Sequence, residues 1–289
     1  MRFRHDHRSV QTVGSPAATP LGLTRSISAG GPTPRLAWAR RTSAVRSRTA
    51  KRTEGNVIRI ATWNCCRASV GKTADACAAL DASLTVLQEA RRPASLAPGH
   101  LWTGIKPHNG LQVVPGQGVM VTLGPVEPAA PWSIIPLTVS QPVELHVLMV
   151  WTRKEHAYVQ GLDAALSTYA AFLAAAPSVV LGDFNANAIW DNARRPTDFS
   201  RVATRLSEQF GLVSAYHAYT GEDFGLESQA THYFWRRRSR PFHIDYCFVP
   251  THWVGGLRNV SILDGPPWDA LSDHRPLVVD WSTERAKRT

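Results

Sequence analysis

The chain has 289 residues, of which 44% are hydrophobic, and its formal net charge is +10. This length fits one large domain or two small ones, and the apolar content supports a packed core. No apolar run approaches the roughly 20 residues that a membrane-spanning helix needs, so no transmembrane segment is expected.

The positive charge is concentrated in residues 1–55, which contain 11 Lys or Arg and 2 Asp or Glu. The remainder holds 21 basic and 20 acidic residues, so the overall basicity does not predict a nucleic-acid surface there. Because residues 1–55 are rich in Arg, Ser, Thr, Ala and Pro, we expect a disordered N-terminal segment. Residues 56–289 are then expected to form one folded domain.

Three interpretations of the basic segment stay open: a tail that binds nucleic acid or a membrane surface, an organelle transit peptide, and an upstream extension from a wrongly chosen start codon. It contains no continuous apolar stretch of the ~7–15 residues found in secretory signals, so we expect a cytoplasmic protein. The four cysteines form no CxxC pair and no zinc-like spacing. We expect them to be free thiols in a reducing compartment.

Periodicity predicts strands and helices in alternation along the rest of the chain. Short apolar runs predict strands at 57–65, 84–87, 118–123, 145–151, 178–187, 231–235, 243–249, 260–263 and 276–281. Apolar residues at helical spacing predict helices at 72–82, 160–175 and 199–210, the last of them ended by Gly211. Strands with intervening helices indicate an α/β fold.

The most informative stretch is 178–187, where an apolar run leads through Gly182 into Asp183 and Asn185. Side chains alternate between the two faces of a strand, so Asp183 and Asn185 are expected on one face and Phe184 on the other, toward the core. A carboxylate and an amide presented together can grip a metal-bound phosphate. A strand that simply ends in a polar turn is the alternative.

Four other stretches have the same form, an apolar run that delivers polar side chains: 58–65, 84–90, 243–250 and 271–281. The polar residues at the ends of these five stretches are Asn64, Glu89, Asp183, Asn185, Asp245, Asp273 and His274. In this order they resemble the endonuclease/exonuclease/phosphatase superfamily, which includes deoxyribonuclease I, abasic-site endonucleases, inositol polyphosphate phosphatases and neutral sphingomyelinases. The resemblance covers residues 57–281. It implies a four-layer α/β sandwich, with two mixed β-sheets packed face to face and helices outside.

The residue types suit metal-assisted hydrolysis of a phosphate ester. His274 is expected to be the general base, oriented by Asp245, a pairing that the resemblance also implies. Asp183 and Asn185 would hold the attacking water and a phosphate oxygen. Glu89 offers a hard oxygen ligand for Mg²⁺, or for Mn²⁺.

Two further residues would help to hold that metal ion. Asn64 would support the metal ligand or donate to phosphate, and a strand-end cap is its plainer interpretation. Asp273 would approach the metal or orient the neighbouring loop.

The substrate contacts are less well specified. Trp151 stands where the superfamily usually carries a His or Tyr that contacts the phosphate or the leaving oxygen, and His156 or Tyr158 could take that role. His243 would share a strand face with Asp245 and contact phosphate, unless it is an ordinary polar strand residue. Arg237 and Arg238, in the basic turn 235–240, would bind the phosphate backbone, unless the turn is a solvated hairpin tip.

We therefore expect a monomeric, divalent-metal-dependent hydrolase of phosphodiester bonds, an endonuclease or exonuclease acting on nucleic acid. One alternative keeps the fold and changes the substrate to a small or lipid phosphate ester. The other is a catalytically weak relative that has kept only a phosphate-binding pocket. The Trp151 departure keeps this last alternative open.

Overall fold

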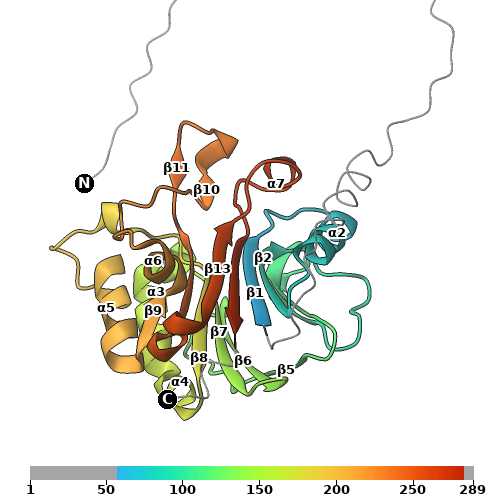
Figure 1. Cartoon of the computed structure of the whole chain (residues 1–289), viewed down its shortest axis with the longest axis horizontal. Coiled ribbons are helices and arrows are strands. Elements are labelled where there is room, and N and C mark those ends of the chain that lie inside the picture. The colour runs from blue at the N-terminus through green and yellow to red at the C-terminus, as the bar shows by residue number, and fades with distance from the viewer. Residues whose placement is uncertain (1–56, 283–289) are drawn as a thin grey trace, which may run out of the picture. The chain divides into compact units, whose positions relative to one another are not determined.

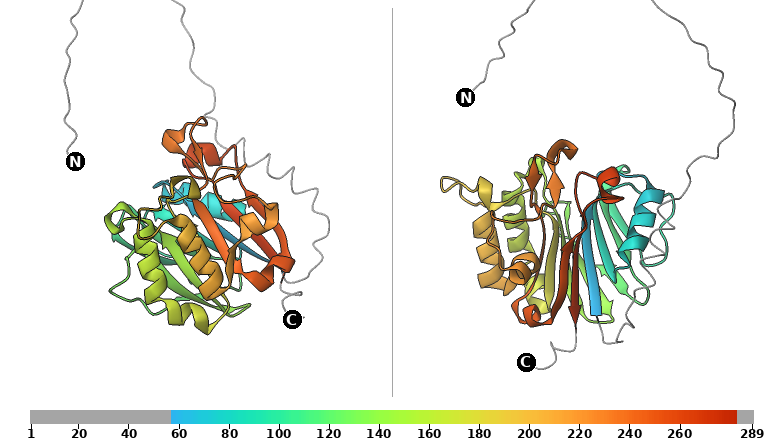
Figure 2. Two further views of the ribbon diagram at one scale, coloured as in Figure 1. Left: turned by 90° about the vertical axis from the view of Figure 1, so that its left-hand side faces the viewer. Right: turned by 45° about the horizontal axis from the view of Figure 1, so that its top comes forward.

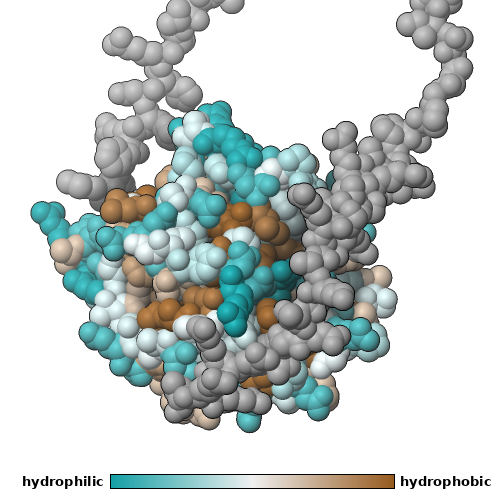
Figure 3. Space-filling view, viewed as in Figure 1, coloured by the Kyte–Doolittle hydropathy of each residue, from teal (hydrophilic) through white to brown (hydrophobic). Residues whose placement is uncertain are grey.

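The structure is a computed structural model and describes residues 57–282 (Figure 1). The basic segment 1–55, with the expectation that it is disordered, lies outside the described residues. No helix within 57–282 combines the length and the apolar character needed to cross a membrane. On the face shown in Figure 3, hydrophobic surface occurs in separate patches between polar areas.

Two six-stranded sheets form the centre of the molecule. The first has the order β13-β14-β1-β2-β4-β3, and its strands are β13 (Leu257–Ile262), β14 (Leu277–Ser282), β1 (Val57–Asn64), β2 (Leu84–Ala90), β4 (Asn109–Pro115) and β3 (Leu101–Lys106). Strand β1 runs parallel to β2 and antiparallel to β14. The carboxyl ends of β1 and β2 therefore lie at the same edge of this sheet.

The second sheet has the order β5-β6-β7-β8-β12-β9, and its strands are β5 (Met120–Leu123), β6 (Ile134–Gln141), β7 (Leu145–Trp151), β8 (Ser178–Asp183), β12 (Asp245–Pro250) and β9 (Leu212–Ser214). Strands β7 and β8 are parallel, whereas β12 is antiparallel to β8. Both sheets are therefore mixed, as the superfamily resemblance implies.

Alternation along the strands builds three apolar layers. In β1, Ile60 faces the core between the sheets, whereas Ala61 and Trp63 face an outer cluster under helix α2 (Val70–Leu80). In β8, Val179 and Leu181 face the central core, and Val180 faces the helices on the other side.

The helices on that side are α3 (Val159–Thr168), α4 (Ala170–Ala175) and α5 (Phe199–Phe210). The result is the expected four-layer sandwich, seen edge-on in the right view of Figure 2.

Several element bounds differ from the sequence prediction. The helix predicted at 160–175 is interrupted at Tyr169, whose φ of −96° and ψ of 15° separate α3 from α4. The strand predicted at 178–187 ends at Asp183, because Asn185 has a left-handed backbone with φ of 46°.

Some strands were not predicted. Strands β3, β4, β6 and β9 were missed, and β6 carries Pro136, a residue that disfavours a strand in a local pattern. The strand predicted at 231–235 shrinks to β10 (His232–Tyr233), which pairs with β11 (Pro241–Phe242) and continues into the short helix η4 (Phe234–Arg236).

All four cysteines are free, as expected. Cys65 and Cys247 are buried, and burial raises the pKa of each thiol to about 12.

Candidate active site

The polar ends of the strands meet at one edge of the sandwich. Asp245, the first residue of β12, is the direct register partner of Asp183, the last residue of β8. Asn64 ends β1 in the other sheet, and Glu89 lies near the end of β2. The hairpin β10–β11 and the short helix α7 (Trp268–Leu271) stand above this edge in Figure 1.

Asn64 joins the two sheets. Its Nδ2 donates to Asp183 Oδ2 at 2.9 Å and to Glu89 Oε1 at 3.3 Å. Its Oδ1 accepts from the backbone N–H of Cys66 at 3.0 Å. Asn64 therefore holds both carboxylates through its amide nitrogen, while its oxygen is fixed by the chain that follows β1.

A local bulge directs Glu89 toward the site. The register between β2 and β4 shifts between Leu87 and Ala90, and Glu89 has a φ of 53°. A bulge of this kind changes the direction of a side chain at the end of a strand. The Glu89 carboxylate lines a cavity, with one oxygen held by Asn64 and the other 3.5 Å from Arg67 Nε.

The turn after β8 holds Asp183 and Asn185 together. The Asn185 backbone N–H donates to Asp183 Oδ1, and its Nδ2 donates to Asp183 Oδ2, both at 2.9 Å. The same amide donates to the Thr152 carbonyl at 3.1 Å. Phe184, between them, is fully buried against the outer helices. The opposite directions of Phe184 and its two polar neighbours agree with the prediction.

His274 lies between two carboxylates. Its Nδ1 is 2.9 Å from Asp245 Oδ2, and its Nε2 is 4.0 Å from Asp183 Oδ2. The side chains of Asp183 and Asp245 are only 1% and 0% exposed. Ser272 Oγ fixes the loop, because it accepts from the His274 backbone N–H and donates to the Asn64 carbonyl at 2.7 Å.

Burial and mutual charge determine how these groups hold protons. Burial, together with the nearby charge of Asp245, raises the pKa of Asp183 to about 7, against the opposing effect of His274. Burial lowers the pKa of His274, but the carboxylates of Asp245 and Asp183 outweigh it and raise this pKa to about 10. The two carboxylates therefore favour the protonated form of His274, whose Nδ1 faces Asp245 Oδ2.

Asp273 and His232 also line the cavity. His232 forms an isolated backbone bridge with His274, and their ring centroids are 4.4 Å apart. His232 Nε2 is 3.8 Å from Asp273 Oδ2. Burial raises the pKa of Asp273, but the imidazoles of His232 and His274 outweigh this effect and hold the pKa below its usual range.

The sequence analysis assigned no role to His232. Nothing in the local pattern marks it, because its closeness to His274 arises from pairing between distant segments.

The cavity has a volume of about 730 Å³. Glu89, Asp183, Asn185, Asp273 and His274 line its polar part. Its remaining wall includes side chains of the β10–β11 hairpin, Trp190 of the short helix η3 (Ala188–Trp190), and Cys66 and Arg67 after β1.

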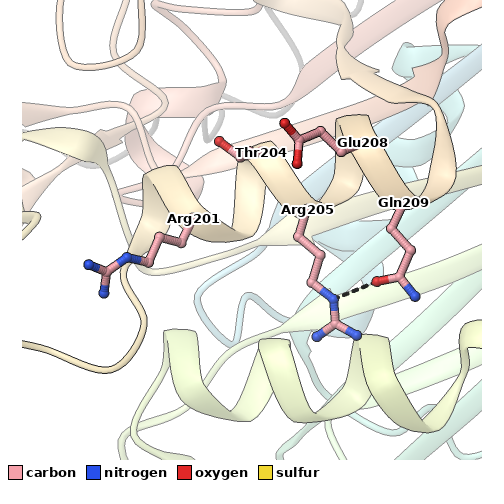
Figure 4. A pocket seen from close by; sticks show the side chains of 5 residues that line it. All are labelled: Arg201, Thr204, Arg205, Glu208 and Gln209. Carbon is pink, nitrogen blue, oxygen red and sulfur yellow. Dashed lines mark hydrogen bonds between the residues drawn. The ribbon is translucent and has the colours of Figure 1, made fainter.

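A second depression lies on the exposed face of α5 (Figure 4). Its side chains come from one helix, and Arg205 donates to Gln209 Oε1 at 2.8 Å and also binds Asp163. It does not include any of the polar residues predicted for the site.

Four residues expected to contact substrate lie elsewhere. Trp151 is 4% exposed in the core between the sheets, where its indole packs edge-to-face on Trp132 at 5.8 Å. His243 faces Tyr216, away from this cavity, because β12 begins only at Asp245 and its alternation does not extend back to residue 243.

The two arginines are also outside the cavity wall. Arg238 pairs with Asp264 and Asp269, and Arg237 lies over the Trp235 ring at 5.5 Å. Arg240, from the same turn, does line the cavity. Neither His156 nor Tyr158, the suggested substitutes at Trp151, is among the lining residues.

The residues present fit a divalent cation. Two sets of side chains have potential ligand atoms within 4.8 Å of one another: Asp183, Asp245 and His274 in one, and His232, Asp273 and His274 in the other. Asp245 Oδ1 is buried without a hydrogen-bond partner among residues 57–282. The carboxylates of Glu89 and Asp273, which line the open part of the cavity, are the hard oxygen donors that Mg²⁺ or Mn²⁺ prefers.

Solved structures that share this fold include nucleases from several organisms. An AP endonuclease from Leishmania major is 14% identical over 78% of this chain and 88% of its own, with a TM-score of 0.59. A 3'-5' exonuclease from Neisseria meningitidis is 21% identical over 78% of this chain and 100% of its own, with a TM-score of 0.57. An AP endonuclease from Archaeoglobus fulgidus is 16% identical over 78% and 99%, with a TM-score of 0.55.

No curated protein matches the chain in sequence. At the level of whole families, however, residues 61–274 match the Endonuclease/Exonuclease/phosphatase family. This match spans well over half of the chain and contains every polar strand end described above. The chain belongs to the endonuclease/exonuclease/phosphatase family.

Proposed function

We propose that the protein hydrolyses phosphodiester bonds with the help of a divalent metal ion, and that it acts as a nuclease. The observation that carries this proposal is the buried array Asp183–His274–Asp245, which opens onto a cavity that also presents Glu89 and Asp273. Perturbed, mutually coupled ionisable groups at a cavity are typical of acid–base chemistry. The nucleic-acid substrate is supported by the solved nucleases that share the fold.

In this proposal, Glu89 and Asp273 hold the ion. A bound Mg²⁺ or Mn²⁺ would polarise the phosphoryl oxygen and neutralise its charge. Asn64 keeps Glu89 in place through its amide. The Nε2–H of His274 would bind a phosphate oxygen, and Asn185, whose amide donates to Asp183 and to the Thr152 carbonyl, would bind one after giving up one of these bonds.

The proton of the attacking water passes to Asp183 in this scheme. His274, the general base expected from the sequence, is held toward its protonated form by two carboxylates, and in this scheme it would donate to the phosphate. Asp183, with a pKa near neutrality, can accept the proton and share it with His274. Asp245 orients the ring by accepting from Nδ1.

The test is plasmid nicking by the full chain with Mg²⁺, with Mn²⁺ and with EDTA, beside a panel of small and lipid phosphate esters. We expect nicking with either metal and none with EDTA. Hydrolysis confined to the small or lipid esters would contradict the nuclease assignment. If none of the substrates is hydrolysed with either metal, the alternative of a protein that only binds phosphate would hold. Sedimentation of the same preparation tests the proposed monomer.

A further inference from the structure

Exposed aromatic side chains gather at the mouth of the cavity. Trp235 is 63% exposed, Trp190 43% and Phe234 38%, and all three line the cavity. Phe234 lies against Trp235 with a centroid distance of 4.7 Å, and Trp190 lies against Phe242 at 4.9 Å. Large apolar rings that remain in solvent beside a polar cavity mark a binding surface.

The turn that carries Trp235 is held in an unfavourable backbone conformation. Trp235 and Arg236 have consecutive φ values of 56° and 58°, the left-handed region that non-glycine residues rarely adopt. Such a conformation persists only when its surroundings impose it, and it is frequent at ligand sites.

Two arginines hold the turn in this backbone conformation. The Arg236 guanidinium donates to the carbonyls of Asp269 and Leu271 at 3.3 and 3.4 Å, and Arg238 binds both carboxylate oxygens of Asp269 at 2.8 Å. The turn is thereby anchored to α7. Trp235 takes no part in this anchoring.

The two other arginines of the turn are available to a ligand. Arg240 and Arg237 lie over the Trp235 ring, at 5.0 and 5.5 Å from its centroid. Within residues 57–282, the carboxylates near the turn pair with Arg238 and Arg275 and not with these two. A base that stacks on this indole would take the place of a guanidinium over the ring, and the displaced guanidinium could bind the attached phosphate.

We propose that Trp235 stacks on an unpaired nucleobase while Arg240 binds the adjoining phosphate, so that the substrate class is single-stranded nucleic acid or an unpaired end. This inference rests on the proposed function. A base inside a duplex has both faces covered by its neighbours and cannot present one to Trp235. Stacking on an aromatic side chain contributes about 1–3 kcal/mol per base, which corresponds to about 5- to 150-fold in affinity.

Fluorescence anisotropy tests the stacking. The full chain carrying Asp183→Asn, with Mg²⁺ present, is titrated against a labelled single strand of about 12 nucleotides, the size of a typical single-strand site. A blunt duplex and an abasic strand of the same length are the comparison ligands. We expect the single strand to bind more tightly than either.

Adding Trp235→Ala should weaken single-strand binding by about 5- to 150-fold and affect the abasic strand much less. Adding Arg240→Ala should weaken both strands alike, because it removes a phosphate contact. Tyr219→Ala is the matched control, since Tyr219 is 47% exposed on helix α6 (Ala215–Thr220) and outside the cavity lining. It should leave all affinities unchanged.

Equal single-strand affinity with and without Trp235 would overturn the inference. So would Trp235-dependent binding to phosphatidylglycerol vesicles without such binding to the oligonucleotide, because it would assign the turn to a membrane surface. If Mg²⁺-dependent hydrolysis is present while Trp235→Ala has no effect on binding, this inference alone fails. If Trp235→Ala weakens binding but no hydrolysis occurs, the proposed function alone fails.

Discussion

At the scale of single residues, the central feature is the sharing of charge among Asp183, His274 and Asp245. Each is almost completely buried, so each charge depends on its neighbours for stabilisation. Removing one partner leaves the others unpaired. The consequences of substitution should therefore be strongly interdependent.

His274→Ala should reduce turnover by at least about 10²-fold, the low end for an acid–base group. Asp245→Asn should also reduce it, because an amide lacks the charge that favours protonated His274 and can turn its NH₂ toward the Nδ1–H. Since groups that act as a unit lose activity non-additively, the double variant should be little worse than His274→Ala. Steady-state kinetics on one oligonucleotide gives all three values. Exposed His252 provides the control, His252→Ala. If the loss in the double variant equals the product of the two single losses, His274 and Asp245 do not act as a unit.

Glu89→Gln should raise the Mg²⁺ concentration that gives half-maximal activity and leave the fold intact. The amide keeps the shape of the side chain but lacks the charge that a hard cation requires. A metal titration of activity in both proteins measures the shift, and circular dichroism checks the fold. Glu208→Gln, on the exposed face of α5, is the matched control. An unchanged midpoint would remove Glu89 from the ligands.

At the scale of elements, the site depends on strand ends that approach one another closely. Gly182 has a φ of 142°, and a Cβ there would lie 1.8 Å from the Val150 carbonyl oxygen. Only glycine permits β8 to pass β7 at this distance. The position of Asp183, the next residue, follows from it.

Gly182→Ala should destabilise the fold by about 4 kcal/mol or more, a size reserved for severe strain or clashes. Gly71→Ala is the matched comparison, because Gly71 lies in α2 and a Cβ there meets nothing within 4 Å. Because Gly71 is the second residue of α2, that change should alter the free energy of unfolding by less than about 1 kcal/mol, the difference between Gly and Ala inside a helix. Chemical denaturation of both proteins measures the difference. Equal stabilities would contradict the close approach of β7 and β8.

Glu227 connects three segments of the chain. Its Oε1 accepts from Asn187 Nδ2 at 3.0 Å, after β8, and lies 3.2 Å from His217 Nε2 in α6. Burial favours the neutral acid, but the hydrogen bonds from His217, Asn187 and backbone N–H groups lower the pKa of Glu227 to about 2.

A carboxyl group with a depressed pKa stabilises the fold above its unfolded pKa, and the stabilisation is lost as the pH falls toward the folded value. Glu227→Gln should therefore cost on the order of 2 kcal/mol at neutral pH. The gap from the parent protein should close between pH ~4.5 and ~2, the unfolded and folded pKa values. Urea unfolding across that pH range measures it, with Glu208→Gln as control. A gap independent of pH would mean that the charge of Glu227 contributes nothing.

At the scale of the whole molecule, residues 57–282 form two six-stranded sheets and three apolar clusters. The family match lies within the same limits. The composition of residues 1–55 predicts no packed core in that segment.

A chain that starts near Glu54 should therefore retain the stability and the hydrolytic activity of the full chain. Thermal unfolding and oligonucleotide cleavage, compared between the two lengths at equal salt concentration, test this expectation. A loss of more than about 1–2 kcal/mol, large beside ordinary surface effects, would show that the segment contributes to the fold.

The sequence by itself determined the family, the layered α/β architecture and the meeting of seven polar residues. The α/β class and the polar strand ends, such as Asn64 and Asp183, follow from local patterns. The resemblance of these strand ends to the superfamily implied the layers and the meeting of the polar residues. Alternation along one strand also placed Phe184 and Asp183 on opposite faces. Such inferences need only the geometry of a single element.

Only the tertiary structure decided which side chains line the cavity. His232 approaches His274 through a bridge between segments far apart in sequence, Trp151 packs on Trp132 in the core, and Arg238 turns away to Asp269. The β10–β11 hairpin, which carries His232, also places Trp235 and Arg240 at the cavity. These positions depend on the register and on the partner of each strand, which a local pattern does not contain, because long-range packing selects them.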